Sequence, residues 1–355
     1  MKDIKGIKRI LIRATNWIGD SIMSLPALVE TKRNFPEAHI SVLLRPWVKP
    51  IFESHPCVDE IIVYDKKRDK SRNLLELARI IRMLRNRQFD MAILFQNAFE
   101  AALIAFLSDI RIRLGLDTDG RRFLLSHPVK RRTHQHHVEN YLDILRGIGI
   151  RTRETEPVLY IKDRHISEAE MILKECGIET DEPLIGLAPG AMYGPAKRWP
   201  ARYFATIGDW AVTRWGAKVI IMGSRKEMDI CAHVRALMKE DAINLCGKTD
   251  LGVSMGIIKR CNMLVSNDSG LMHIAAALGV ATIAIFGSTD PAATGPRGAH
   301  FRIIRHDIPC SPCFRRECPY DLQCLYSVTP DQVWKDMEDM WNETSSILGQ
   351  GWHNK

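Results

Sequence analysis

The stretch Met263–His273 combines residue types suited to binding a nucleotide. An apolar run at 263–265 predicts a buried strand, and a polar turn with Asp268, Ser269 and Gly270 separates it from a helix-like segment containing His273. The first turn of a helix carries unpaired N–H groups and the positive end of the helix dipole, which suits a phosphate. Asp268 can also accept hydrogen bonds from ribose hydroxyls. The plainer alternative is that Asp268 or Ser269 only caps the helix.

A second loop offers positive charge for the same ligand. The apolar stretch 183–189 predicts a strand that ends at Gly190, and Lys197 and Arg198 follow before a helix. Cations and bare N–H groups in a glycine-containing loop are suited to a diphosphate, although the loop can equally be an ordinary basic one. After the next strand, Glu227 is a candidate for a ribose or adenine contact, or for a place in the first turn of a helix.

A carboxylate near the N-terminus is a candidate general base. The first predicted strand, 8–13, leads into a loop with Asn16 and Trp17, and Asp20 lies at the start of a helix-like segment. A carboxylate in that position can accept the proton of a substrate hydroxyl. The alternative is an aspartate that merely stabilises the first helical turn. The loop lacks the G-x-G-x-x-G pattern, so dinucleotide binding is only weakly indicated.

Positive charge is concentrated in the first half of the chain. The whole protein has a formal net charge of +8, and residues 1–160 carry 28 Lys and Arg against 19 Asp and Glu. The segment 121–137 is the most basic and includes Arg121 and Arg122, and Gln96 ends a predicted strand nearby in sequence. These features predict an anionic partner, either a phosphorylated glycolipid at a membrane surface or nucleic acid, unless the surface is simply solvated. The absence of interleaved aromatic residues in 121–137 argues against single-stranded RNA.

Four of the nine cysteines are close together in the sequence: Cys310, Cys313, Cys318 and Cys324. This spacing is compatible with a structural zinc site, with disulfides or with free thiols, and these alternatives stay open. No nucleophile–base pattern accompanies them, which argues against a catalytic role. The other five cysteines are expected to be reduced core residues.

Apolar strands alternate with helical segments along the whole chain, which predicts an α/β protein with parallel sheets. A chain of 355 residues is expected to form two lobes. No apolar run reaches the ~20 residues needed to span a bilayer. The basic N-terminus is followed by a short run interrupted by Arg13, so we expect a first strand and not a signal peptide, and hence a cytoplasmic protein.

The chain resembles the ADP-heptose:lipopolysaccharide heptosyltransferases of glycosyltransferase family 9, of the heptosyltransferase II type. The resemblance covers nearly the whole chain and lies in four blocks: Asn16–Asp20 with Ser24–Pro26, Pro189–Ala191 with Lys197–Pro200, Asn267–His273, and Phe286–Pro291. It implies a GT-B fold of two Rossmann-like parallel-sheet lobes with an interlobe cleft. We expect an acceptor-binding lobe at 1–165, a nucleotide-sugar-binding lobe at 166–355, and a last helix at about 329–348 that packs back towards the first lobe.

The resemblance also implies a reaction: inverting transfer of heptose from ADP-heptose to a heptose of the lipopolysaccharide inner core, at the inner face of the cytoplasmic membrane. Asp20 matches the family's catalytic carboxylate and Lys197 its diphosphate-binding lysine, while Arg198 and Glu227 match less well. Asp268, Ser269, Gly270 and His273 match its nucleotide-binding turn, and Gly190 belongs to the lysine block. The resemblance implies no need for a divalent cation in catalysis, and it does not account for the four clustered cysteines. No nucleic acid partner is implied.

Other activities remain compatible with the sequence. A transferase of the same family with another sugar or acceptor is the nearest alternative, with Asn16, Trp17, Gln96, Arg121 and Arg122 as the expected acceptor contacts in either case. A nucleotide-sugar 2-epimerase would consume the donor without an acceptor. A basic glycolipid- or RNA-binding protein would not need Asp20 and would bind in a strongly salt-dependent manner.

Overall fold

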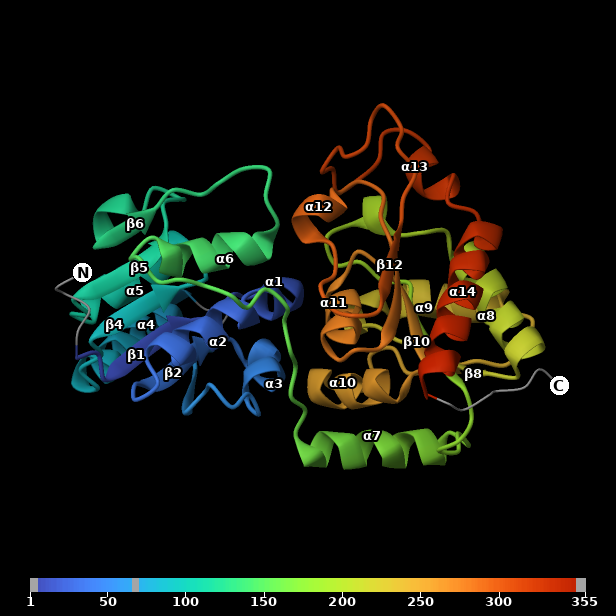
Figure 1. Ribbon diagram of the computed structural model, residues 1–355, viewed down its shortest axis with the longest axis horizontal. Helices are drawn as coiled ribbons and strands as arrows, with labels where there is room; N and C mark the ends of the chain where they lie inside the picture. The colour runs from blue at the N-terminus through green and yellow to red at the C-terminus, as the bar shows by residue number, and fades with distance from the viewer. Residues whose placement is uncertain (1–5, 66–69, 349–355) are drawn as a thin grey trace. The chain divides into compact units, whose positions relative to one another are not determined.

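The computed structural model describes residues 6–65 and 70–348, which form two compact units (Figure 1). Unit 1 is Met1–Tyr160 and unit 2 is Ile161–Lys355. The division precedes helix α7, Asp163–Glu175, which therefore belongs wholly to unit 2, whereas a boundary after residue 165 would divide this helix.

Unit 1 is built on a six-stranded sheet with the order β3-β2-β1-β4-β5-β6. All of its strand pairs are parallel; Ile12 of β1, for example, lies between Val42 of β2 and Ile93 of β4. The strands are β1 Arg9–Arg13, β2 His39–Leu44, β3 Glu60–Val63, β4 Met91–Leu94, β5 Ile112–Leu116 and β6 His127–Val129. The short edge strand β6 was not expected, because its three half-buried residues lie in a basic segment without an apolar pattern.

Helices connect these strands. The α-helices are α1 Ile18–Met23, α2 Leu25–Asn34, α3 Lys49–Phe52, α4 Lys70–Asn86, α5 Phe99–Leu107 and α6 His137–Arg146, with short 3-10 turns η2 Pro46–Val48 and η3 Arg122–Leu124. Central strand β4 is completely buried, which agrees with a sheet that is covered on both faces.

Unit 2 repeats this arrangement. Its sheet has the order β12-β11-β10-β7-β8-β9, and its strand pairs are again parallel. The strands are β7 Leu184–Ala188, β8 Lys218–Ile221, β9 Ile243–Asn244, β10 Met263–Asn267, β11 Ala281–Ile285 and β12 Phe301–Ile304. The predicted α/β class with two parallel sheets is thus confirmed, although edge strand β12, which contains Arg302, was not expected.

The helical elements of unit 2, besides α7, are η4 Pro195–Lys197, α8 Ala201–Trp215, η5 Arg225–Glu227, α9 Met228–Leu237, α10 Leu251–Arg260, α11 Gly270–Ala277, α12 Pro291–Thr294, α13 Gln323–Tyr326 and α14 Pro330–Leu348. Trp334 of α14 packs against Trp210 and Trp215 of α8, with ring centroids 5.8 and 4.5 Å apart. The apolar face of α14 is therefore buried in the core of unit 2. No helix in the described ranges is both long and apolar enough to cross a bilayer.

The strand order determines where ligands can bind. In each sheet the chain first adds strands to one side and then crosses to the other, so the order reverses between β1 and β4 in unit 1 and between β7 and β10 in unit 2. In open parallel sheets, ligands bind outside the carboxyl ends of the strands at such a reversal. Asp20 and Gln96 follow β1 and β4, and Lys197 and Asp268 follow β7 and β10.

Candidate functional site

In unit 2, Asp268 holds two donors from separate loops. The Nζ atom of Lys197 lies 2.5 Å from Oδ2 of Asp268, and the Thr289 hydroxyl donates to the same oxygen at 2.6 Å. The side chains of Lys197 and Asp268 are only 11% and 6% exposed. A lysine ammonium has three hydrogens, so Lys197 keeps donors for a ligand while Asp268 fixes its position.

Asn267 ties the lysine loop to the end of β10. Its side-chain amide donates to the carbonyl of Pro189 at 2.8 Å, and its Oδ1 accepts from the backbone N–H of Trp199 at 2.9 Å. Trp199 is completely buried and donates through Nε1 to the carbonyl of Val328 at 2.8 Å. These hydrogen bonds fix the residues on both sides of the loop 190–198, which limits the positions that Lys197 can adopt.

Helix α11 begins beside this ion pair, at Gly270. Ser269 is the N-cap residue, yet its side chain forms no capping hydrogen bond; its hydroxyl lies 3.1 Å from that of Ser266 instead. The carboxylate of Asp268 is engaged by Lys197 and Thr289, so neither residue fulfils the simple capping role that was the alternative. The first turn keeps N–H groups for an anion, and His273 is buried within the helix.

Glu227 lies after β8 and packs against the start of the lysine loop at Gly190. Its Oε2 accepts from the backbone N–H and the hydroxyl of Ser224, at 2.8 and 2.7 Å, which forms a capping box. Its other oxygen, Oε1, faces Gly190, where a Cβ atom would lie only 2.3 Å away. Gly190 is thus needed for close packing against this carboxylate. The Nε atom of Arg198 is buried and has no hydrogen-bond partner within the described structure.

In unit 1, Asp20 lies in the first turn of α1 and has two partners from α6. The hydroxyl of Tyr141 donates to its Oδ1 at 3.1 Å, and Nδ1 of His137 lies 3.7 Å from the same oxygen. The Asp20 side chain is 29% exposed. Burial, and then the charge of Asp20, hold the pKa of Tyr141 well above its usual value, so the phenol stays protonated. Within the described residues no hydrogen bond reaches Oδ2, which leaves that oxygen for a substrate proton.

The loop before Asp20 is held by buried Arg13. Its guanidinium donates to Oδ1 of Asn16 at 3.1 Å and to the carbonyls of Ala14 and Leu43. Burial lowers the pKa of Arg13 to about 10. Asn16 is therefore engaged in shaping the loop, whereas the indole of Trp17 is 56% exposed beside it and available for a substrate.

The two adjacent arginines of the basic segment have different surroundings. Arg121 is completely buried and donates to the carbonyls of Leu116 and Gln96 and to Oδ1 of Asn97. We therefore assign Arg121 a structural role in place of the expected substrate contact. Arg122 is exposed, with an ion pair to Asp117 at 2.7 Å, and Gln96 is half-buried at the end of β4.

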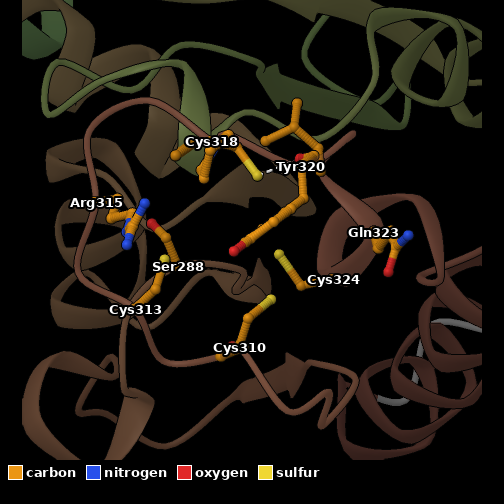
Figure 2. A pocket seen from close by; sticks show the side chains of 12 residues that line it. Ser288, Cys310, Cys313, Arg315, Cys318, Tyr320, Gln323 and Cys324 are labelled. Carbon is orange, nitrogen blue, oxygen red and sulfur yellow. Dashed lines mark hydrogen bonds between the residues drawn. The ribbon is translucent and has the colours of Figure 1, made fainter.

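The four clustered cysteines line one cavity of about 330 Å³ in unit 2 (Figure 2). All nine cysteines are free thiols. Burial, followed by the nearby thiols of Cys318, Cys310 and Cys313, raises the pKa of Cys324. Across residues 6–65 and 70–348, no group of three or more His, Cys, Asp or Glu side chains is arranged to hold a metal ion, so this arrangement does not support the predicted zinc site.

Four residues at these sites were not predicted as site residues. Asn267 and Thr289 belong to motifs that the sequence displays, but their contacts depend on the pairing of β10 with β7 and β11. Tyr141 and His137 come from a helix more than a hundred positions after Asp20. No local pattern marks that distant pair, apart from the histidine-rich start of α6.

Comparison with known proteins identifies the family to which the chain is similar. Residues 77–323 match the model of glycosyltransferase family 9 (heptosyltransferase). The chain is 31% identical to lipooligosaccharide heptosyltransferase 2 of Haemophilus ducreyi over 94% of this chain and 99% of that protein. It is 30% identical to lipopolysaccharide heptosyltransferase 2 of Escherichia coli over 84% and 88% of the two chains.

Solved structures agree with this assignment. A glycosyl transferase family 9 protein from Veillonella parvula superposes with a TM-score of 0.84 and 25% identity, covering 95% of this chain and 97% of that one. ADP-heptose lps heptosyltransferase II of E. coli gives a TM-score of 0.81 and 26% identity, covering 95% and 99%. Together with the match over most of the chain, these similarities show that this protein is a glycosyltransferase and belongs to family 9, the heptosyltransferase family.

Proposed function

We propose that this glycosyltransferase moves heptose from ADP-heptose to a heptose of the lipopolysaccharide inner core, with inversion at the anomeric carbon. The observation that carries the proposal is the Lys197–Asp268–Thr289 cluster beside the start of α11, because it provides a fixed cation and free N–H groups for a diphosphate. The heptosyltransferase 2 relatives from Haemophilus and Escherichia support the choice of donor and acceptor.

Unit 2 would hold the donor. As the bond between the anomeric carbon and ADP breaks, negative charge develops on the leaving diphosphate and must be stabilised. Lys197 donates to that charge, the N–H groups at Gly270 contribute the positive end of a helix dipole, and Arg198 adds a second cation. Lysine and helix N-terminus together would do the work that a divalent cation does in other transferases. Glu227 and Gly190 would border the ribose.

Unit 1 would activate the acceptor. An acceptor hydroxyl attacks the anomeric carbon from the face opposite ADP, and its proton passes to Oδ2 of Asp20 as the new glycosidic bond forms. Tyr141 and His137 contact Oδ1 and keep the carboxylate oriented. A single displacement of this kind inverts the anomeric centre.

The acceptor would meet Trp17, Gln96 and Arg122. The exposed indole of Trp17 offers an apolar face for a sugar ring, and the exposed Arg122 suits a phosphate of the inner core. The positive excess in residues 1–160 would bring the protein to the inner face of the cytoplasmic membrane as a peripheral protein. Sedimentation with anionic vesicles should then decrease as salt is added; no binding at low salt would refute the membrane association.

The proposed function is tested by ADP release from ADP-heptose, with and without a mono-heptosylated core acceptor. Wild type should release ADP only with the acceptor, and Asp20→Asn should lose about 10²–10⁴-fold in rate. Asp109→Asn, an exposed aspartate of the same unit, is the matched control and should keep full activity. ADP release without acceptor would instead favour a hydrolase or a 2-epimerase, and a fully active Asp20→Asn would exclude Asp20 as the base.

A further inference from the structure

We propose that unit 1 docks on an anionic lipid surface through an exposed apolar patch, with neighbouring arginine and lysine side chains on the lipid phosphates. The patch, here called the aromatic face, consists of Phe99, Phe106 and Leu107 of α5 and Phe123 of η3. This docking rests on the proposed function, whose acceptor is a lipopolysaccharide. It goes beyond an attraction by net charge, because it assigns the membrane contact to particular side chains and gives it an apolar component.

Helix α5 is apolar on both of its faces. Its inner face contributes alanine and isoleucine side chains to the core of unit 1. The exposed residues Phe99, Phe106 and Leu107 are spaced by seven and eight positions, which places them together on the outer face. Glu100 is the one charged residue of α5. A surface helix in water normally carries polar residues on its outer side, so this second apolar face indicates a non-aqueous partner.

Phe123 extends the aromatic face beyond the helix. Its ring is 72% exposed, and its centroid lies 6.1 Å from that of Phe99. At the other end of α5, the guanidinium of Arg113 lies 5.2 Å from the ring centroid of Phe106 and donates to the carbonyl of Leu124 at 2.6 Å. The turn η3 is therefore tied to both ends of α5, which makes the aromatic face one continuous patch.

Positive charge lies at the Phe123 end of the aromatic face. Arg122 is exposed and forms an ion pair with Asp117 at 2.7 Å. The N–H of Asp117 donates to the carbonyl of Val129 at 2.7 Å, so the exposed basic residues 130–132 begin beside this ion pair. Cations in this position can bind lipid phosphates while the adjacent rings enter the apolar layer.

Charge also favours a lipid surface over a second copy of this chain as the partner. At the end of α5, the exposed Arg85 of α4 donates to the carbonyl of Leu107 at 2.8 Å. The segment 99–132 carries seven Lys and Arg against four Asp and Glu, with Asp109 and Asp119 among the exposed acids. Two such faces would repel each other, whereas anionic headgroups attract this net positive charge.

The test measures binding of full-length protein to mixed phosphatidylcholine and phosphatidylglycerol vesicles by sedimentation. Phe106→Ser/Phe123→Ser should weaken this binding at least about 10-fold, because it removes apolar area that the membrane buries. Met171→Ser/Leu237→Ser removes two exposed apolar side chains from unit 2 and should bind like wild type. Circular dichroism checks folding, and the single variant Phe123→Ser, at the most exposed of these positions, should still show a several-fold loss.

Two results would overturn the proposed docking. One is a double variant that binds vesicles as tightly as wild type. The other is a wild-type dimer in sedimentation equilibrium that dissociates in Phe106→Ser/Phe123→Ser, since the aromatic face would then bind a second copy.

Activity measurements separate this docking from the proposed function. On a soluble acceptor without acyl chains, the double variant should release ADP as fast as wild type, whereas its KM for an acceptor embedded in vesicles should rise several-fold. Wild type that binds vesicles through the aromatic face but releases no ADP from ADP-heptose would overturn the proposed function and support the docking. Wild type that transfers heptose but binds no vesicles would overturn the docking alone.

Discussion

The hydroxyl of Tyr141 lies 3.1 Å from Oδ1 of Asp20, although the two residues are 121 positions apart. Tyr141 is buried, and its ring packs edge-on against Phe95 at the end of β4, with centroids 5.6 Å apart. The phenol is thus held by the sheet and in turn holds the carboxylate. In the proposed mechanism Tyr141 is a positioning residue, because its contact is with Asp20 and not with a reacting atom.

Removing that hydroxyl should weaken the reaction without unfolding the protein. We expect Tyr141→Phe to lower kcat by about 10-fold, since a hydrogen bond to a charged group contributes about 1.5–3 kcal/mol, and to leave KM for ADP-heptose nearly unchanged. Steady-state kinetics and a thermal melt provide the measurement. A KM effect larger than the kcat effect would contradict a role through Asp20.

Substitutions in the Lys197–Asp268 ion pair should separate its effect on stability from its effect on activity. Lys197→Met leaves a buried carboxylate that keeps only the Thr289 hydroxyl as a side-chain donor among the described residues, which should cost about 3–5 kcal/mol of unfolding free energy. The double variant Lys197→Met/Asp268→Asn removes the uncompensated charge and should recover most of that loss. In both variants kcat/KM should fall at least about 10²-fold below the wild-type value. Removal of other groups that stabilise transition-state charge has effects of this size. Activity recovered in the double variant would show that Lys197 is only structural.

Glu227→Gln separates the capping role of Glu227 from ligand binding. Glutamine also serves at this position of a capping box, so the unfolding free energy should change by no more than about 0.5 kcal/mol. If Oε1 takes ribose hydroxyls, calorimetry should show several-fold weaker ADP binding. Unchanged ADP affinity in Glu227→Gln, combined with lost stability in Glu227→Ala, would assign this residue to the cap alone.

Substitution of the neighbouring residues Arg121 and Arg122 should affect different properties: protein stability for Arg121 and acceptor binding for Arg122. Arg121→Met removes the donor to the buried carbonyls of Leu116 and Gln96. The loss should destabilise unit 1 by about 2–4 kcal/mol. Arg122→Met should leave the melting temperature unchanged and raise the KM for the acceptor several-fold, because this exposed side chain is bound only to Asp117 within the described structure. Equal effects of the two substitutions on stability would contradict this division.

His55 should make unit 1 sensitive to mild acid. Burial lowers the pKa of His55 from 6.5 to about 4, so the folded protein keeps the ring neutral while the unfolded chain takes up a proton below pH 6.5. Stability is therefore lost as pH falls from 6.5 towards 4, by about 2 kcal/mol at pH 5.

The variant His55→Asn isolates this effect. Asparagine keeps an acceptor for the N–H of Cys57, which now donates to Nδ1 at 3.2 Å, but it does not titrate. Urea unfolding between pH 7 and 5 should show the smaller loss in His55→Asn, and exposed His134→Asn should behave like wild type. Identical pH dependence in all three proteins would exclude His55 as the sensitive group.

Much of the architecture could be predicted because it depends on local patterns. Strand β2, His39–Leu44, has the bounds that its apolar run indicates, and the alternation of such runs with helices requires parallel sheets. The loops with Asp20, Lys197 and Asp268 could be recognised because each follows a buried strand, and the carboxyl ends of parallel strands are where ligands bind. These properties belong to single segments and need no knowledge of their neighbours.

The tertiary structure decided which of the candidate side chains are available. The adjacent residues Arg121 and Arg122 look alike in sequence, but only folding buries the first on carbonyls of β5 and of the turn after β4. Only the strand order β11-β10-β7 brings Thr289, Asp268 and Lys197 together, and only the packing of α6 against α1 gives Asp20 its partner Tyr141. Sequence pattern reports the environment along one element, whereas hydrogen-bond partners and burial are set by contacts between elements distant in the chain.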